Sequence, residues 1–173
     1  MVEKLTLSRM ILELIQNSID ADCKKIMIDI KVTSLEKYVY SIEVIDDGMV
    51  LGDINSYHEK GYSSKSSSGL GLYLINKFCL ENDGYYKFDR INHKSIVTFS
   101  FKNIDFYDLT DLVDIIYLTS CNYEIIFNYT YDNYKFTYDS LEIKDILKDI
   151  SIRELSVMNH LKEFIRNGLK NIK

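Results

Sequence analysis

Hydrophobic residues recur every three to four positions between residues 7 and 21, a spacing that predicts an amphipathic helix with one apolar face. Residues 25–32 and 38–45 instead alternate between apolar and polar side chains, which predicts two half-buried strands joined as a hairpin. The other elements expected in this part of the chain are a helix at 72–79 and a second hairpin formed by 85–91 and 95–102. Helices and antiparallel strands therefore share the first hundred residues.

The character of the chain changes after residue 103. The pattern there predicts three helices and one more hairpin: helices at 107–120, 141–148 and 152–169, and strands at 123–131 and 134–138. Asp132-Asn133 is a typical two-residue hairpin turn, and Ser140 is expected to cap the helix that follows it. No catalytic cluster occurs here. We expect residues 1–103 to form one domain and 104–173 a small α/β extension packed on it, with a docking or dimer surface as the alternative.

Composition narrows the class of protein. Of the 173 residues, 46% are apolar and 13% aromatic, which is enough for a full core. The formal net charge of −5 argues against nucleic acid as the main partner, because phosphate binding needs a basic surface. No apolar run approaches the length of a membrane span and no signal peptide opens the chain, so we expect no membrane contact and a cytoplasmic location. The three cysteines show no metal-binding spacing and are expected to be reduced.

The first helix carries the first candidate chemistry. Glu13, Asn17 and Asp20 fall in one narrow sector opposite the apolar face. The Glu13 carboxylate can take a proton from water, and the Asn17 amide oxygen can join the shell of a Mg²⁺ that keeps some of its waters. An ordinary helix with a solvated polar face would show the same pattern, so this helix is not sufficient evidence alone.

Two further stretches strengthen the interpretation of this helix as part of a binding site. Asp46-Asp47-Gly48 closes the second strand, and a serine-rich segment with the single Lys65 leads into Gly69-Leu70-Gly71 before the next helix. Glycines at a helix start free the backbone so that its N–H groups can point at phosphate oxygens.

The three stretches resemble, in order, the motifs of the ATP-binding domain shared by DNA gyrase, histidine kinases, MutL and the anti-sigma-factor kinases. ELIQNSIDA is similar to the first motif, VIDDG to the second and SSKSSSGLGLYLI to the third, and the resemblance covers about residues 6–102. It implies a two-layer α/β sandwich with a mixed, mostly antiparallel sheet and helices on one face. The family has a second glycine after Gly48, whereas this chain continues with Met49 and Val50.

The resemblance also implies ATP and Mg²⁺ as ligands and assigns a role to each matching residue. These roles are Asn17 for Mg²⁺, Asp46 and Gly48 for the adenine side, Lys65 for the γ-phosphate, Gly69 and Gly71 for the phosphates, Ser95 for the adenine through its hydroxyl, and Glu13 as the general base.

Three functions remain open at this point. The first is a weak ATPase in a cytoplasmic bacterial regulator, and the second is a kinase of the anti-sigma or histidine-kinase type that phosphorylates a separate protein. The third is a non-hydrolysing ATP sensor that binds a partner only when nucleotide is present. The sequence does not identify that protein partner, and a homodimer is possible.

Overall fold

A computed structural model describes residues 5–49 and 71–170. Its helices and strands follow one another as α1 (Leu7–Asp20), β1 (Lys25–Ser34), β2 (Tyr38–Asp46), α2 (Gly71–Glu81), β3 (Tyr85–Ile91), β4 (Lys94–Asn103), α3 (Leu112–Ser120), β5 (Glu124–Tyr131), β6 (Tyr134–Asp139), α4 (Ser140–Leu147) and α5 (Leu155–Lys170).

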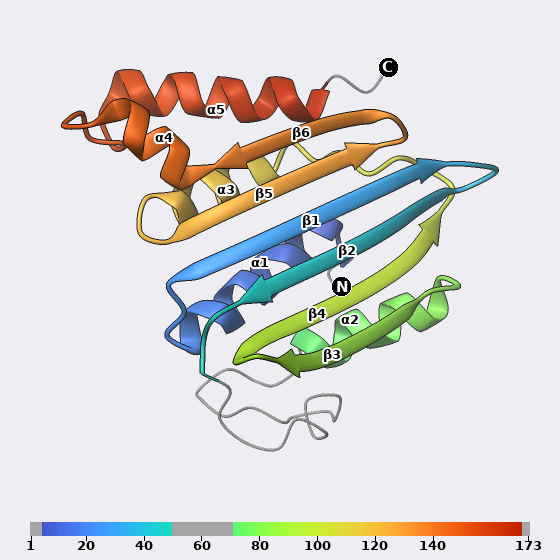
Figure 1. The fold of residues 1–173 in the computed structure, drawn as a ribbon. Helices are drawn as coiled ribbons and strands as arrows, with labels where there is room; N and C mark the ends of the chain where they lie inside the picture. Colours follow the sequence, from blue (N-terminus) through green and yellow to red (C-terminus); the bar gives the residue numbers. More distant parts are fainter. Residues whose placement is uncertain (1–4, 50–70, 171–173) are drawn as a thin grey trace.

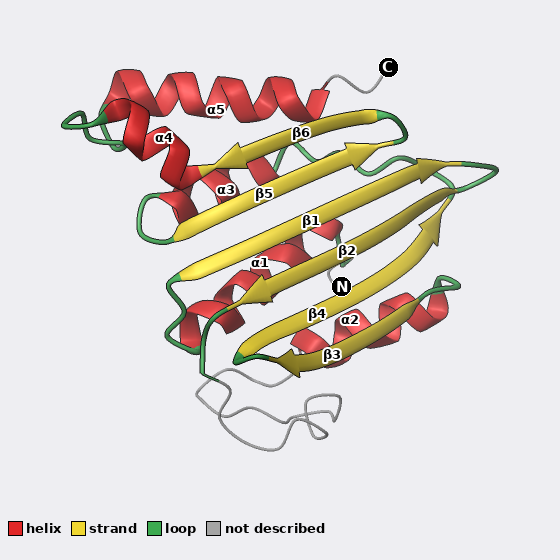
Figure 2. Cartoon of the chain, viewed as in Figure 1, coloured by secondary structure: helices red, strands yellow, loops and turns green. Residues whose placement is uncertain are grey.

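The six strands form one sheet in the order β3-β4-β2-β1-β5-β6. Every neighbouring pair is antiparallel except β1 and β5, which run parallel, and α1, α2 and α3 lie behind the sheet (Figures 1 and 2). This arrangement confirms the predicted two-layer α/β sandwich with a mixed, mostly antiparallel sheet. No helix in the described part of the chain is both long and apolar enough to cross a membrane.

The core lies between the sheet and these helices, and alternation along the strands places it there. Alternate residues of β1 and β2 point to the helices and are at most 2% exposed: Ile26, Ile28, Ile30, Val32, Tyr40, Ile42 and Val44. Helix α1 contributes Leu7, Met10, Ile11, Leu14 and Ile15 from its apolar face, and Thr6 caps its first turn. Burial of this apolar stripe explains why a short helix forms at this position.

Residues beyond 103 extend the same sheet. Strand β5 pairs with β1 along its whole length, and the backbone N–H of Glu124 donates to the Lys24 carbonyl at 2.9 Å. On the way there the chain crosses an aromatic cluster in which the Tyr40 ring stacks on Phe101 at 4.9 Å and meets Tyr107 edge-on at 5.5 Å. The expected α/β extension is thus continuous with the first hundred residues, and its division from them as a separate domain stays a prediction.

Three predicted boundaries in this region were wrong. Helix α3 begins at Leu112 and not at residue 107, because the backbone N–H of Tyr107 donates to the Tyr40 hydroxyl at 2.8 Å. Helix α5 begins at Leu155 and not at residue 152. The cap of α4 is Asp139, whose carboxylate accepts from two backbone N–H groups, and not Ser140, whose hydroxyl accepts from the Ile125 N–H instead.

Candidate functional site

Asp46 lies at the end of β2 on the side that faces the helices, and only 9% of it is exposed. Its Oδ2 accepts a hydrogen bond from the Ser18 hydroxyl at 2.8 Å, and its Oδ1 accepts from the backbone N–H of Gly48 at 2.9 Å. Each carboxylate oxygen therefore has one fixed donor and keeps room for a second. A buried acceptor held in this way can take an N–H from a ligand without first reorienting.

Sequence analysis missed Ser18. It follows Asn17 directly, but its side chain is on the buried side of α1, one turn after Leu14, whose carbonyl lies 3.1 Å from the Ser18 hydroxyl. The signal that could have found it is a hydroxyl in phase with the apolar stripe of the helix, since a buried polar group needs a partner.

The packing of the segment after β2 against α1 requires a glycine at position 48. A Cβ at this position would lie 2.7 Å from the Ala21 Cβ and 2.9 Å from the Ala21 carbonyl oxygen. The next residue, Met49, donates its backbone N–H to that same carbonyl at 2.7 Å. The absence of a side chain thus lets the segment after β2 pack against the end of α1. The predicted role of Gly48 beside the adenine stays a prediction.

Ser95 and Arg90 complete this end of the sheet. Ser95 on β4 is opposite Asp46 of β2 in the register on one side and opposite Arg90 of β3 on the other. The Arg90 Nη1 donates to Ser95 Oγ at 3.3 Å and to the Gly48 carbonyl at 3.2 Å. The structure thus brings the predicted Asp46, Gly48 and Ser95 together.

Arg90 is the second residue that sequence analysis missed. The sequence signal is the Asn92-His93 pair in the hairpin turn. In the structure both residues have positive φ, at 51° and 64°. A two-residue turn of this kind fixes the register of the flanking strands, and that register puts Arg90 beside Ser95.

Glu13 and Gly71 meet where α1 approaches the start of α2. A Cβ on Gly71 would lie 2.8 Å from Glu13 Oε2, so the carboxylate rests against the first residue of α2. The other oxygen, Oε1, forms an ion pair with Arg9 Nη2 at 3.1 Å, one turn earlier on α1. The first N–H groups of a helix lack partners within the helix, and its dipole favours anions there. The predicted base and one predicted phosphate-binding glycine therefore lie together.

Asn17 follows Glu13 by one turn on α1 and is partly exposed. The described residues contain no group of three or more His, Cys, Asp or Glu that could hold a metal. One amide oxygen nevertheless suits Mg²⁺, which keeps several waters and takes phosphate oxygens from its nucleotide. The residues present fit that ion on this basis. Lys65, Gly69 and Val50 lie outside the described residues, and their predicted roles stay predictions.

Asp47 has a structural role beside the site. Its Oδ1 accepts from the backbone N–H groups of Lys24 and Lys25 at 2.8 and 3.0 Å, which ties the end of β2 to the start of β1. Burial alone would raise the pKa of the Asp47 carboxyl, but these N–H donors outweigh it and hold that pKa below its usual value.

We predict that Cys23 and Cys79 resist thiol reagents in the folded protein. Burial raises the pKa of each thiol to about 12, and at Cys23 the negative charges of Asp46 and Asp47 add to it. Since the thiolate is the nucleophile, maleimide at pH 7.5 should label the partly exposed Cys121 first. Peptide mass spectrometry after a short pulse measures this, with labelling in denaturant as the control. Equal labelling of Cys23 and Cys121 in the native protein would contradict it.

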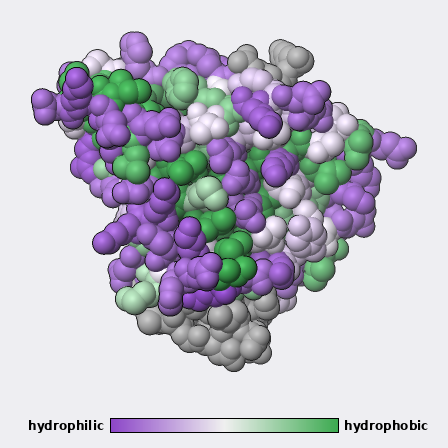
Figure 3. All heavy atoms as spheres, in the orientation of Figure 1, coloured by the Kyte–Doolittle hydropathy of each residue, from purple (hydrophilic) through white to green (hydrophobic). Residues whose placement is uncertain are grey.

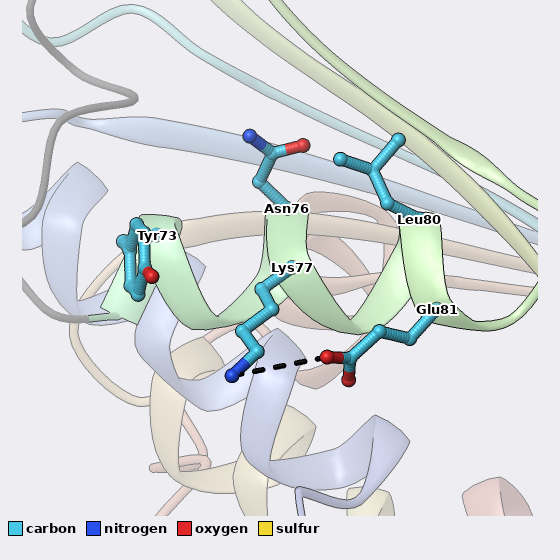
Figure 4. Close-up of a pocket in the computed structure, with 5 residues that line it drawn as sticks. All are labelled: Tyr73, Asn76, Lys77, Leu80 and Glu81. Atoms are coloured by element: carbon cyan, nitrogen blue, oxygen red, sulfur yellow. Dashed lines mark ion pairs between the residues drawn. The ribbon is translucent and has the colours of Figure 1, made fainter.

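A shallow depression of about 350 Å³ lies on α2. Its lining is Tyr73, Asn76, Lys77, Leu80 and Glu81, with an ion pair of 3.8 Å between Lys77 and Glu81 (Figure 4). All five belong to one helix and none is a predicted site residue. We assign no ligand to this depression.

Comparison with known proteins identifies the family. The family described as histidine kinase-, DNA gyrase B- and HSP90-like ATPase matches residues 3–104. A crystal structure of the N-terminal domain of a DNA repair protein is similar over 78% of this chain, at 16% sequence identity and a TM-score of 0.44. The match covers 51% of that structure's chain, so the present chain spans about half its length. No curated protein sequence matches. The family match covers more than half of the chain, which therefore belongs to the histidine kinase-, DNA gyrase B- and HSP90-like ATPases.

Proposed function

We propose that this chain binds ATP together with Mg²⁺ and hydrolyses it slowly, as a cytoplasmic bacterial regulator that acts on a protein partner. The observation that carries the proposal is the contact of Glu13 Oε2 with Gly71 at the start of α2. It supports a carboxylate beside the place where a helix start offers N–H groups to phosphate.

The residues divide the work of binding. Asp46, held by Ser18 and Gly48, accepts an N–H of the adenine. Ser95 and Arg90, which are hydrogen-bonded to each other, lie at the same end of the sheet. Asn17 would hold Mg²⁺, which when bound offsets the negative charge of the phosphates. Gly71, with Gly69 before it, lets backbone N–H groups approach the phosphate oxygens.

Glu13 performs the proton transfer in this proposal. A water near Oε2 gives its proton to the carboxylate as the water oxygen attacks the terminal phosphorus, and ADP leaves with the bridging oxygen. The ion pair with Arg9 leaves Oε2 available because it engages Oε1.

The second candidate is an ATP sensor without turnover, and the Arg9–Glu13 ion pair is the observation that favours it. A carboxylate that stays engaged by a guanidinium cannot orient water as freely as an unpaired one. Transfer of the γ-phosphate to a separate protein is the third outcome that the experiment must separate.

We expect ATP with Mg²⁺ to stabilise the folded protein by roughly 2.7 kcal/mol at a ligand concentration of about 100 Kd. A thermal-shift titration with and without Mg²⁺ measures this. Incubation with γ-labelled ATP then distinguishes the functions: free phosphate indicates an ATPase, label on an added protein fraction a kinase, and neither a sensor. No shift at millimolar ATP would contradict nucleotide binding altogether.

A further inference from the structure

The face of the sheet turned away from α1, α2 and α3 carries a row of apolar side chains. Ile96, Ile45, Met27 and Ile126 are register partners on β4, β2, β1 and β5, so they cross the four central strands side by side. Each is partly exposed. Figure 3 views this face and shows hydrophobic residues running across it among hydrophilic ones. We call these four residues the apolar row.

A pair of acidic side chains lies next to the apolar row on the same face. Asp29 and Glu43 are direct register partners on β1 and β2, two positions along from Met27 and Ile45. Like charges placed directly opposite each other in a sheet are destabilising. Within residues 5–49 and 71–170, no Lys, Arg or His forms an ion pair with either carboxylate, and the Thr98 hydroxyl donates to Glu43 Oε2 at 3.5 Å.

We propose that this face docks a basic, amphipathic helical segment of a partner protein. Apolar side chains of the segment would cover the row, and its Lys or Arg side chains would relieve the repulsion between Asp29 and Glu43. An acidic pair without an ion-pair partner in the described residues, beside an apolar surface, favours a cationic partner, because each charge then contributes to encounter and to specificity. The same charge pattern, together with the net charge of −5, repels nucleic acid and anionic membranes.

The dimensions of the row fit a helix. Four strands spaced about 4.8 Å apart make the row roughly 14 Å long. A helix rises about 1.5 Å per residue and 5.4 Å per turn, so about ten residues span it and each turn brings one side chain over one strand. Spacing of apolar anchors at i, i+3, i+4 and i+7 is the pattern by which helices are recognised in grooves.

The proposed docking surface would bind the protein partner of the proposed regulator, and in that sense it rests on the proposed function. Docking itself needs no nucleotide. It is therefore tested in nucleotide-free protein. The probe is a fluorescein-labelled helical peptide of 14 residues with leucine on one face and lysine on the other, and the matched control peptide has glutamate in place of every lysine. Fluorescence anisotropy measures the Kd of each, and hydrogen exchange maps where the lysine peptide protects the protein.

We expect the lysine peptide to bind and to protect β1, β2, β4 and β5, and the glutamate peptide to bind at least about tenfold more weakly. The double variant Asp29→Asn, Glu43→Gln should weaken lysine-peptide binding about tenfold and reduce its salt dependence. The matched control is Glu36→Gln, Asp105→Asn, which removes two exposed acids away from the row and should leave the Kd within about twofold. The single variant Ile126→Thr removes one apolar contact and also weakens binding if the row is the docking surface.

Any of three results would overturn the proposal: no binding of the lysine peptide, equal binding of both peptides, or protection confined to other elements. Loss of binding in the control variant would assign the effect to overall charge and would overturn it as well. Circular dichroism and thermal unfolding check that each variant remains folded. Failure of peptide docking with intact ATP binding would leave the proposed ATPase standing, and the converse would leave the docking surface standing.

Discussion

Glu13→Gln should reduce ATP turnover by about 10²–10⁴-fold while ATP affinity changes little. Glutamine has the same size as glutamate, so it still fits against Gly71, but its amide cannot take a proton from water. The effect should therefore appear in the rate of phosphate release and not in the Kd for ATP. A coupled phosphate assay at saturating Mg-ATP measures the first and calorimetry the second.

The matched control is Glu81→Gln on α2, which removes an exposed carboxylate paired with Lys77 and should leave turnover unchanged. If Glu13→Gln hydrolyses ATP at the rate of the wild type, another group is the base. If the wild type shows no turnover while ATP still binds, the sensor is the better description of the protein.

The elements that sequence analysis predicted well are those whose pattern is local. Alternation at β1 and β2 and helical spacing at α1 each follow from one apolar face meeting the same core, and the structure confirms all three. Two-residue turns at Asn92-His93 and Asp132-Asn133 then fix which strands become hairpins. Such features need only neighbouring residues, so they can be read without knowledge of the rest of the chain.

The features that were missed depend on contacts between distant residues. Periodicity predicts β5 but cannot say that it lies parallel to β1, since both edges of a hairpin offer the same backbone groups. The start of α3 was predicted too early because Tyr107 has helical spacing with the residues after it. Its N–H bonds to Tyr40, 67 positions away, and this contact overrides the local preference.

In the candidate site, too, the residues in local motifs were predicted and those that matter through distant contacts were missed. Glu13, Asp46 and Gly71 were proposed as site residues because they stand in motifs that resemble those of the family. Ser18 and Arg90 were missed because their importance comes only from what they touch: an oxygen of Asp46 in one case, Ser95 and the Gly48 carbonyl in the other. Register and helical phase could have suggested both.

Substitution of the adjacent residues Asp46 and Asp47 should have different effects, the first on ATP affinity and the second on the stability of the fold. Asp46→Asn should weaken ATP binding by about 1.5–3 kcal/mol, or about 10–150-fold in Kd, because an amide offers one acceptor where the carboxylate offers two. With Gly48 still donating to the amide oxygen, the new NH₂ group replaces the Oδ2 acceptor beside Ser18, so a ligand N–H that approaches there meets a donor. Calorimetry with Mg-ATP measures the loss of affinity.

Asp47→Asn should instead lower the free energy of unfolding by about 1 kcal/mol and leave the Kd for ATP nearly unchanged. The Asp47 carboxylate accepts from the backbone N–H groups of Lys24 and Lys25, and these donors depress the pKa of its carboxyl. A depressed pKa means that the stabilisation is fully present above the unfolded-state value of 3.8 and is lost as the pH falls through the folded-state value. The difference in urea unfolding between wild type and Asp47→Asn should thus be constant from pH 6 to 8 and shrink in acid. Equal loss of ATP affinity in both variants would mean that the two carboxylates act as one structural unit. Asp46 would then have no separate role in binding the adenine.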